Sequence, residues 1–431
     1  MRLPYAAVEF TTSGEPADDQ QVGAAVKMMR DKQATDVLLL AHGWNNDIPK
    51  AERLFERLVD RLAPELQPTT RTVVVVGLLW PAVQWADDDD IAGGGVSIVD
   101  PRAALDAAIA ESVEDPAAAA ALRAAAAQLE TSAGGREAFV AALRPLLPAD
   151  GDGGEDPVPE ALAEGDAEAL FAAAEEAEAL ADDDELFADA ADAAPQMPPG
   201  IAPDLLGVGA ATGTGVNIKS ALVDARRLLN VTTYYLMKDR AGKVGSRGVT
   251  KLVRRLRQER PDVAVHLAGH SFGARVVSAA AASSDVPIDS VTLLQGAFSH
   301  FGFAHNYADS GKDGAFRRAL TGGQLRGPIL ITHTHNDRAV ATAYAVASRI
   351  ARQTGAALVG GPNDPYGGVG ANGALGTDEA LDETLLAKDA HYDFTARRIY
   401  NLRADTFVSG HSVVTGPEVA HALAAAMTAG R

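Results

Sequence analysis

A serine between two glycines is the clearest candidate for chemistry in this sequence. Gly269-His270-Ser271-Phe272-Gly273 has the G-x-S-x-G spacing, in which a serine sits on a tight turn between a strand and a helix. Small residues two positions away on either side let the turn close without a clash, and the turn exposes the serine hydroxyl. The pattern predicts that Ser271 is a nucleophile. The alternative is a tight glycine-rich turn with a passive serine.

The residues around this motif favour the nucleophile. The apolar run Val263–Ala268 precedes it and has the continuous hydrophobicity of a strand buried in a parallel sheet. An Ala- and Val-rich stretch from Ala274 follows and is typical of a helix. The start of that helix would place backbone N–H groups and the positive end of the helix dipole beside Ser271. Strand, turn and helix therefore follow one another in the order that the motif requires.

A serine hydroxyl needs a general base, and the base needs an acid that orients it. His411 follows the last predicted strand and precedes a predicted helix. Asp337 follows an earlier strand and also precedes a helix. Open parallel sheets place their sites at the carboxyl ends of the strands. We therefore predict a catalytic triad of Ser271, His411 and Asp337, in the chain order serine, acid, histidine.

Other residues could take the two partner roles. Asp405 closely precedes His411 and is the main alternative acid, because an aspartate before a helix, as Asp337 is, often only caps that helix. His411 itself could be an ordinary loop histidine. The rivals for the base are His391 first, and then His333 and His335.

Acyl transfer also needs backbone N–H groups that stabilise the negative charge developing on the substrate oxygen. The N–H of Phe272, directly after the serine, is one predicted donor. The other is predicted on the loop after an earlier apolar strand, where we assign it to Trp44, with Asn45 as the second choice. The alternative is that His42-Gly43 only ends the strand and that Trp44 only fills the core. We expect Asn45 and His270 to contact the substrate.

Strands and helices alternate along most of the chain, which predicts an α/β fold with a mainly parallel sheet covered by helices on both faces. The predicted strands are Tyr5–Thr11, Asp36–Leu40, Thr72–Leu79, Val263–Ala268, Asp289–Leu294, Pro328–Thr332 and Arg397–Asn401. The predicted helices are Asp18–Lys32, Pro49–Leu62, Pro116–Leu129, Pro159–Leu180, 217–238, 245–258, a helix from Ala274, Ala339–Gln353 and Pro417–Ala429. Gly355–Gly376 is rich in glycine and is predicted to be a loop.

One long segment differs from the rest in composition. Residues 86–213 are rich in Ala, Asp, Glu, Gly and Pro, and Asp87–Asp192 contains 28 acidic residues and four arginines, a net charge of −24. Because the whole chain carries −20, the remainder carries +4. We interpret residues 1–85 and 214–431 as one domain. Residues 86–213 would be an acidic insertion, partly helical and partly disordered, that could form a cap.

Composition excludes several classes of site and partner. The 431 residues include no cysteine, which excludes disulfides, a thiolate nucleophile and cysteine-based metal sites. A net charge of −20 argues against nucleic acid as a partner. No apolar run is long enough for a transmembrane helix, and the first residues lack the apolar core of a signal peptide, so we expect a cytoplasmic protein. We predict no metal site, and the sequence leaves the oligomeric state open.

The segments Leu39–Asn45 and Gly269–Gly273, with Asp337 and His411, resemble the corresponding motifs of the α/β-hydrolase superfamily. The resemblance covers the chain outside the insertion and favours the esterase- and lipase-like members, several of which carry a histidine before the nucleophile, as His270 does here. It implies an eight-stranded, mostly parallel sheet, a Ser-His-Asp triad and no cofactor. The insertion departs from many lids of the superfamily, because it precedes the nucleophile motif instead of following a later strand.

We therefore expect a serine hydrolase that cleaves a carboxylic ester, with a small-molecule or lipid-like ester as its partner, through an acyl-enzyme on Ser271. Lipases, peptidases, thioesterases and acyltransferases use the same groups, and the sequence does not separate them. The alternative from a different class is a non-catalytic interaction protein on a hydrolase scaffold, with the insertion as its binding arm. A lid that inserts into membranes is disfavoured, because anionic lipid would repel its negative charge.

Overall fold

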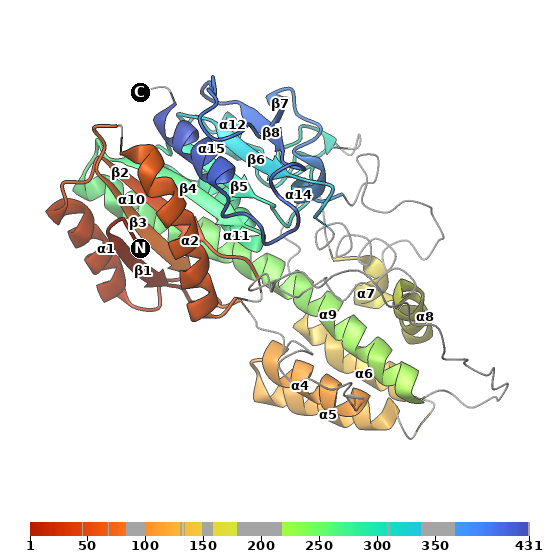
Figure 1. Ribbon diagram of the computed structural model, residues 1–431. Helices are drawn as coiled ribbons and strands as arrows, with labels where there is room; N and C mark the ends of the chain where they lie inside the picture. Colours follow the sequence, from red (N-terminus) through yellow and green to blue (C-terminus); the bar gives the residue numbers. More distant parts are fainter. Residues whose placement is uncertain are drawn as a thin grey trace, which may run out of the picture.

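A parallel sheet forms the centre of the protein. The computed structural model describes residues 1–44, 46–67, 69–82, 100–129, 132, 134–148, 158–178, 218–307, 311–337 and 367–429. The sheet has eight strands in the order β1-β3-β2-β4-β5-β6-β8-β7, and each neighbouring pair is parallel (Figure 1). The strands are β1 Tyr5–Glu9, β2 Asp36–Ala41, β3 Val73–Leu79, β4 Ala264–His270, β5 Ser290–Leu294, β6 Ile329–His333, β7 Ala380–Thr384 and β8 Ile399–Arg403. The predicted α/β fold with a mainly parallel sheet is confirmed.

The inner strands are buried along their whole length because they are apolar on both faces. Every residue of β2, β3 and β4 is buried. Strand β7 is different, since most of its residues are exposed at the edge of the sheet. Its sequence, Ala-Leu-Asp-Glu-Thr, has neither an apolar run nor a regular alternation. The sequence pattern therefore predicts only seven strands, and β7 is the eighth strand of the sheet.

Helices cover both faces of the sheet, and a further group of helices lies at its side. They are α1 Asp19–Asp31, α2 Ile48–Leu66, α4 Pro101–Ser112, α5 Pro116–Leu129, α6 Gly135–Leu143, α7 Glu160–Glu164, α8 Ala167–Glu178, α9 Ile218–Lys243, α10 Thr250–Glu259, α11 Phe272–Ser283, α12 Arg318–Thr321, α14 Val369–Asn372 and α15 Pro417–Thr428. A short 3-10 helix, Arg144–Leu146, follows α6, and a π-helical turn, Val244–Val249, joins α9 to α10. An apolar core lies on each face of the sheet, and successive residues of β2 point into different cores. Leu39 packs with residues of α1, α9 and α11, whereas Leu38 packs with residues of α2 and α15.

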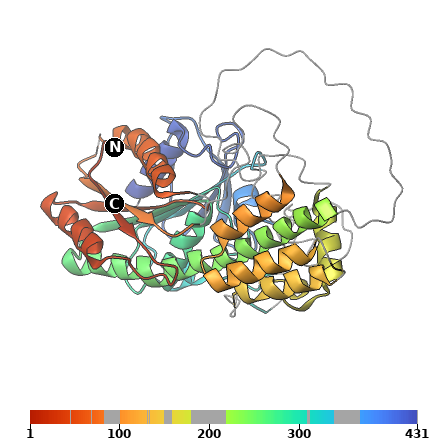
Figure 2. The same cartoon turned by 90° about the horizontal axis from the view of Figure 1, so that it is seen from below.

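The described part of the acidic segment is helical. Helices α4, α5 and α8 pack against α9, and α6 packs against α5, so that they form a helical group at the side of the sheet (Figure 2). Helix α9 also contacts α11, which follows the nucleophile motif. Residues 86–99, 130, 131, 133, 149–157 and 179–213 of the predicted insertion lie outside the described residues, as does the predicted helix Ala339–Gln353.

A buried arginine joins the helical group to the sheet. Arg240 of α9 is 5% exposed, and its Nη2 lies 3.0 Å from Glu114 Oε1, just beyond α4. Its Nη1 donates to the Pro81 carbonyl oxygen at 2.7 Å, shortly after β3. The Arg240 guanidinium therefore links α9 to the helical group and to the backbone that follows β3.

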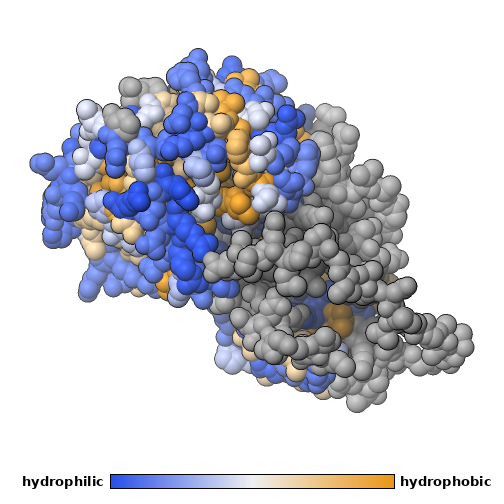
Figure 3. Space-filling model, in the orientation of Figure 1, coloured by the Kyte–Doolittle hydropathy of each residue, from blue (hydrophilic) through white to orange (hydrophobic). Residues whose placement is uncertain are grey.

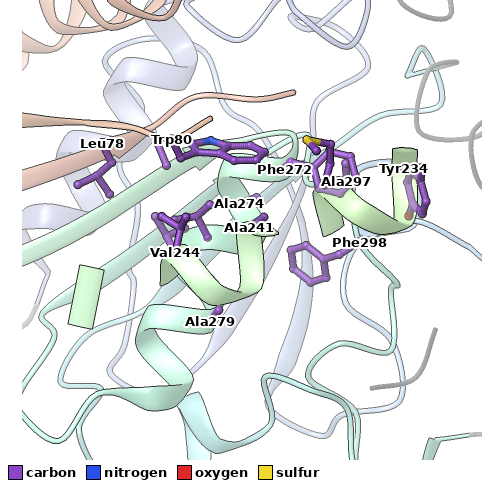
Figure 4. Close-up of a cluster of buried hydrophobic side chains, with 14 of the residues drawn as sticks. Leu78, Trp80, Tyr234, Ala241, Val244, Phe272, Ala274, Ala279, Ala297 and Phe298 are labelled. Atoms are coloured by element: carbon purple, nitrogen blue, oxygen red, sulfur yellow. The ribbon is translucent and has the colours of Figure 1, made fainter. Parts of the chain in front are cut away.

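The core between α9, α11 and the sheet reaches the nucleophile motif. Figure 4 shows Tyr234 of α9 and Phe272 of α11 in one apolar cluster with Trp80, which follows β3. The surface over the sheet is mostly hydrophilic, with apolar side chains exposed in a few patches (Figure 3). None of the described helices combines the length and the apolar character that a membrane crossing needs.

A polar network is buried at the amino ends of β2 and β4. Asp36 accepts hydrogen bonds from Arg71 Nη1 at 2.6 Å and Thr35 Oγ1 at 2.6 Å, and its Oδ1 lies 3.0 Å from His266 Nε2. His266 Nδ1 lies 2.8 Å from Ser290 Oγ. This network is a second series of serine, histidine and aspartate, but the three residues are at most 1% exposed. We interpret it as structural, because a substrate has no access to its hydroxyl.

The protonation of Asp36 leads to a prediction about stability. Burial by itself would raise its pKa, but the hydrogen bonds from His266 and Thr35 and the nearby positive charges lower the pKa to about 2. A carboxyl held this far below its usual pKa stabilises the fold by about 2 kcal/mol at neutral pH, and the contribution fades as the pH falls from about 4 towards 2.

We expect Asp36→Asn to lower the free energy of unfolding by about 2 kcal/mol at pH 7 and by clearly less at pH 3. Urea denaturation of the wild type and the variant at both pH values measures the difference. An equal loss at pH 7 and pH 3 would contradict the role given to the ionised carboxylate.

Candidate active site

Ser271 occupies a strained turn between β4 and α11. Its backbone has φ 56° and ψ −124°, a conformation that costs a residue other than glycine about 1–3 kcal/mol. The Ser271 N–H donates to the Leu294 carbonyl oxygen at 3.0 Å, and the Ser271 carbonyl oxygen accepts from the N–H groups of Ala274 at 3.0 Å and Ala297 at 3.1 Å. Hydrogen bonds from both β5 and α11 therefore hold the turn in its strained form.

The two glycines of the motif are required by close backbone approach. A Cβ atom on Gly269 would overlap the carbonyl oxygen of Gly273. A Cβ atom on Gly273 would overlap the carbonyl oxygen of Ala41 at the end of β2. The G-x-S-x-G spacing thus reflects how tightly β2, β4 and α11 meet at this point.

Ser271, His411 and Asp337 form a hydrogen-bonded series. Ser271 Oγ lies 2.9 Å from His411 Nε2, and His411 Nδ1 lies 2.9 Å from Asp337 Oδ2. An ionised carboxylate can only accept, so we place the imidazole proton on Nδ1, which leaves Nε2 to accept the serine proton. The Asp337 side chain is fully buried, whereas the His411 side chain is 20% exposed. The arrangement can take a proton from the serine hydroxyl and stabilise the resulting positive charge.

The fold brings these residues together because they follow neighbouring parallel strands. Ser271 follows β4, Asp337 comes after β6, and His411 comes after β8. The loop that contains Trp44 follows β2, which pairs with β4. The strand order β2-β4-β5-β6-β8 places all four carboxyl ends along one edge of the sheet.

Asp405, the alternative acid, has other partners. Its Oδ1 accepts hydrogen bonds from Thr334 Oγ1 at 2.7 Å and from the His335 N–H at 3.1 Å. Burial would raise the pKa of Asp405, but these two hydrogen bonds and the nearby histidines lower it. The Asp337 N–H in turn donates to the Thr334 carbonyl oxygen at 3.2 Å. Asp405 therefore stabilises the turn that presents Asp337.

The rival histidines lie elsewhere. His391 and His335 are exposed. His333 Nδ1 lies 3.4 Å from the Ala371 carbonyl oxygen, and burial lowers the pKa of His333. His411 is the histidine that the structure places beside the Ser271 hydroxyl.

A buried histidine positions the loop after β2. Burial lowers the pKa of His42 to about 4, so its ring is neutral at pH 7. Its Nδ1–H donates to the Gly43 carbonyl oxygen at 2.8 Å, and its Nε2 accepts from the Trp80 N–H at 3.2 Å. The Trp80 indole N–H donates back to the His42 carbonyl oxygen at 2.9 Å. The backbone that leads into Trp44 is therefore held by the segment that follows β3.

The two predicted oxyanion residues are in contact. The Phe272 ring lies between Trp44 and Tyr234, with ring centroids 5.8 Å and 5.3 Å away. Phe272 is the first residue of α11, and the first N–H groups of a helix have no partner within it. The packing that we gave as the alternative for the Trp44 side chain is present, and the role of its backbone N–H stays a prediction. Asn45 lies outside the described residues.

Gln295 is a site residue that sequence reasoning missed. It directly follows β5, it is fully buried, and it has a φ of 45°. Its side-chain amide donates to Asp337 Oδ2 at 3.4 Å and to the Gly370 carbonyl oxygen at 3.1 Å. Its place after a predicted strand is the signal that could have identified it. Tyr234 had no such signal, because it lies in the middle of a long helix.

His270 was predicted to contact substrate. The structure places it in the protein interior, where it is 5% exposed and its Nε2 lies 2.9 Å from the His411 carbonyl oxygen. A contact with substrate stays a prediction, but the side chain already has a role inside the protein.

The positive φ at Ser271 should lower the stability of the folded protein, although the turn serves the proposed chemistry. Glycine adopts a positive φ without strain, whereas alanine does not. We expect Ser271→Gly to be more stable than Ser271→Ala by about 1 kcal/mol in urea denaturation. Both variants lack the hydroxyl, so the difference reports the backbone strain less the gain that alanine has from its methyl group and from its smaller unfolded-state entropy. Equal stabilities would contradict strain of the expected size.

Comparisons with protein-family models, curated proteins and solved structures find no match to this chain.

Proposed function

We propose that this protein is a serine hydrolase of the α/β-hydrolase type that cleaves a carboxylic ester through an acyl-enzyme on Ser271. The observation that supports it most is the series of Ser271, His411 and Asp337, with 2.9 Å between each pair of bonding atoms. The serine of this series lies on a strained turn at the carboxyl edge of a parallel sheet. Strain of this kind is concentrated at functional sites, because elsewhere it only lowers stability.

In the proposed reaction, His411 Nε2 takes the Ser271 proton while Oγ attacks the acyl carbon of the ester. The bond to Oγ forms, and the carbonyl oxygen becomes negatively charged near the N–H groups of Phe272 and Trp44. Asp337 stabilises the imidazolium. His411 then gives its proton to the departing alcohol as the ester bond breaks, which leaves an acyl group on Ser271.

The second half of the reaction uses the same groups. A water molecule takes the place of the alcohol, and His411 Nε2 removes its proton as the oxygen attacks the acyl carbon. The bond between Ser271 Oγ and the acyl carbon breaks, Oγ regains its proton from His411, and the acid leaves. Every proton that the imidazole accepts is returned, so the protein ends in its starting state.

Two exposed apolar side chains that follow site residues closely in the chain favour an ester with an apolar group. Ile48, at the start of α2, follows the loop of Trp44 and is 46% exposed. Val413, two residues after His411, is 43% exposed. Both lie on segments that leave the site directly. We propose that they contact the acyl or alcohol part of a small-molecule or lipid-like ester.

The direct test is covalent labelling with a fluorescent fluorophosphonate, which reacts with activated serines. We expect the wild type to be labelled and Ser271→Ala to be unlabelled. Ser290→Ala is the matched control, because Ser290 also contacts a histidine but is fully buried, and this variant should label like the wild type. No labelling of the wild type, or equal labelling of wild type and Ser271→Ala, would overturn the proposal.

The two aspartates near the base should differ in their effect. Replacing the triad acid by its amide reverses the preferred imidazole tautomer and costs on the order of 10⁴-fold in rate in serine hydrolases of this kind. We expect such a loss for Asp337→Asn, and a loss of roughly 10-fold for Asp405→Asn, which only loosens the turn before Asp337. Initial rates with an aryl ester measure both. A larger loss for Asp405→Asn would assign the acid to that residue.

A further inference from the structure

We propose that His270 is a positioning residue that holds the His411 loop against the nucleophile turn. This inference rests on the proposed function, since it concerns how the base of that reaction is placed. His270 directly precedes Ser271, so any contact it makes is fixed relative to the nucleophile. Its role would be to keep the His411 imidazole in line between Ser271 and Asp337.

The contact between His270 and the His411 loop is direct and partly buried. His270 Nε2 lies 2.9 Å from the backbone carbonyl oxygen of His411. A carbonyl oxygen can only accept, so His270 Nε2 must carry the proton and donate it. The two rings are also in contact, with centroids 4.9 Å apart. The backbone of the base and the turn of the nucleophile are therefore joined by one hydrogen bond.

The other edge of the His270 ring faces the loop after β2. A Cβ atom on Gly43 would stand 3.2 Å from His270 Nδ1 and 2.8 Å from Ser271 Cβ. Gly43 immediately precedes Trp44, the second predicted oxyanion donor. The His270 ring thus lies close to the loop of the oxyanion donor and donates a hydrogen bond to the loop of the base.

The position of the base matters because proton transfer depends steeply on geometry. A misplacement of about 1 Å can lower the rate by roughly 10²-fold. The loop around His411 is also held on either side of that residue, where Val408 and Val414 are fully buried in the core. The His270 bond differs from these contacts, because it joins the residue that carries the imidazole to the residue before the nucleophile.

The chemistry of the contact defines a matched set of variants. A glutamine amide nitrogen reaches about as far as histidine Nε2, so His270→Gln keeps a donor for the His411 carbonyl. An asparagine amide nitrogen corresponds to Nδ1, so His270→Asn keeps a polar side chain of similar character but cannot reach. His270→Ala removes the ring and the donor together.

The experiment measures the rate of fluorophosphonate labelling of each variant between pH 5 and pH 9, with thermal unfolding as the check of folding. We expect labelling of His270→Ala and His270→Asn to be roughly 10- to 100-fold slower than that of the wild type. His270→Gln should recover most of the wild-type rate. The acid limb of the pH profile reports the pKa of His411. It should move to lower pH in the alanine and asparagine variants, because a looser contact with Asp337 stabilises the imidazolium less.

The outcomes separate this inference from the function on which it rests. If folded His270→Gln and His270→Asn label at the same rate, or if all variants keep the wild-type rate and pH profile, the positioning role is wrong. The hydrolase proposal would still stand in that case, provided that the wild type labels and Ser271→Ala does not. If the wild type itself does not label, both proposals fail. Should His270→Ala not fold, the comparison of glutamine with asparagine still decides.

Discussion

The positive φ of Ser271 is the constraint on which the rest of the site depends. The turn is held by hydrogen bonds that Ser271 makes with Leu294 at the end of β5 and with Ala297. Its form also requires glycine at 269 and 273, because backbone from β2 and α11 lies where their side chains would be. The strands beside β4 therefore impose the conformation, and the conformation directs the hydroxyl towards His411. Without the parallel packing of β2, β4 and β5, the same five residues would make an ordinary turn.

Helix α9 connects the helical group to the proposed oxyanion pair. Tyr234 of α9 packs on Phe272, and Phe272 packs on Trp44. Helix α9 also packs against the helices of the acidic segment, and its Arg240 contacts Glu114 and the backbone after β3. A displacement of α9 would thus reach the residue whose N–H is proposed to hold the oxyanion. Helix α9 therefore joins the described part of the acidic segment to the candidate site.

Much of the fold could be predicted from the sequence, because strands buried in a parallel sheet consist of unbroken runs of apolar residues. β3 is an example, since six of its seven residues are Val or Leu. β7 could not be recognised in this way, because an exposed edge strand needs no apolar face. The triad candidates followed from the rule that sites lie at strand ends. Gln295 obeys the same rule but was missed, since an amide is not a catalytic group and its φ of 45° leaves no sign in the sequence.

In the proposed site, the strained turn holds the Ser271 hydroxyl between an imidazole and two backbone donors. A crystal structure of the protein after reaction with a phosphonate tests it most directly, because the adduct mimics the tetrahedral intermediate. We expect phosphorus bonded to Ser271 Oγ, with one phosphonyl oxygen about 3 Å from the N–H groups of Phe272 and Trp44 and with His411 Nε2 beside the leaving position. An adduct on another residue, or a phosphonyl oxygen directed away from both N–H groups, would contradict it.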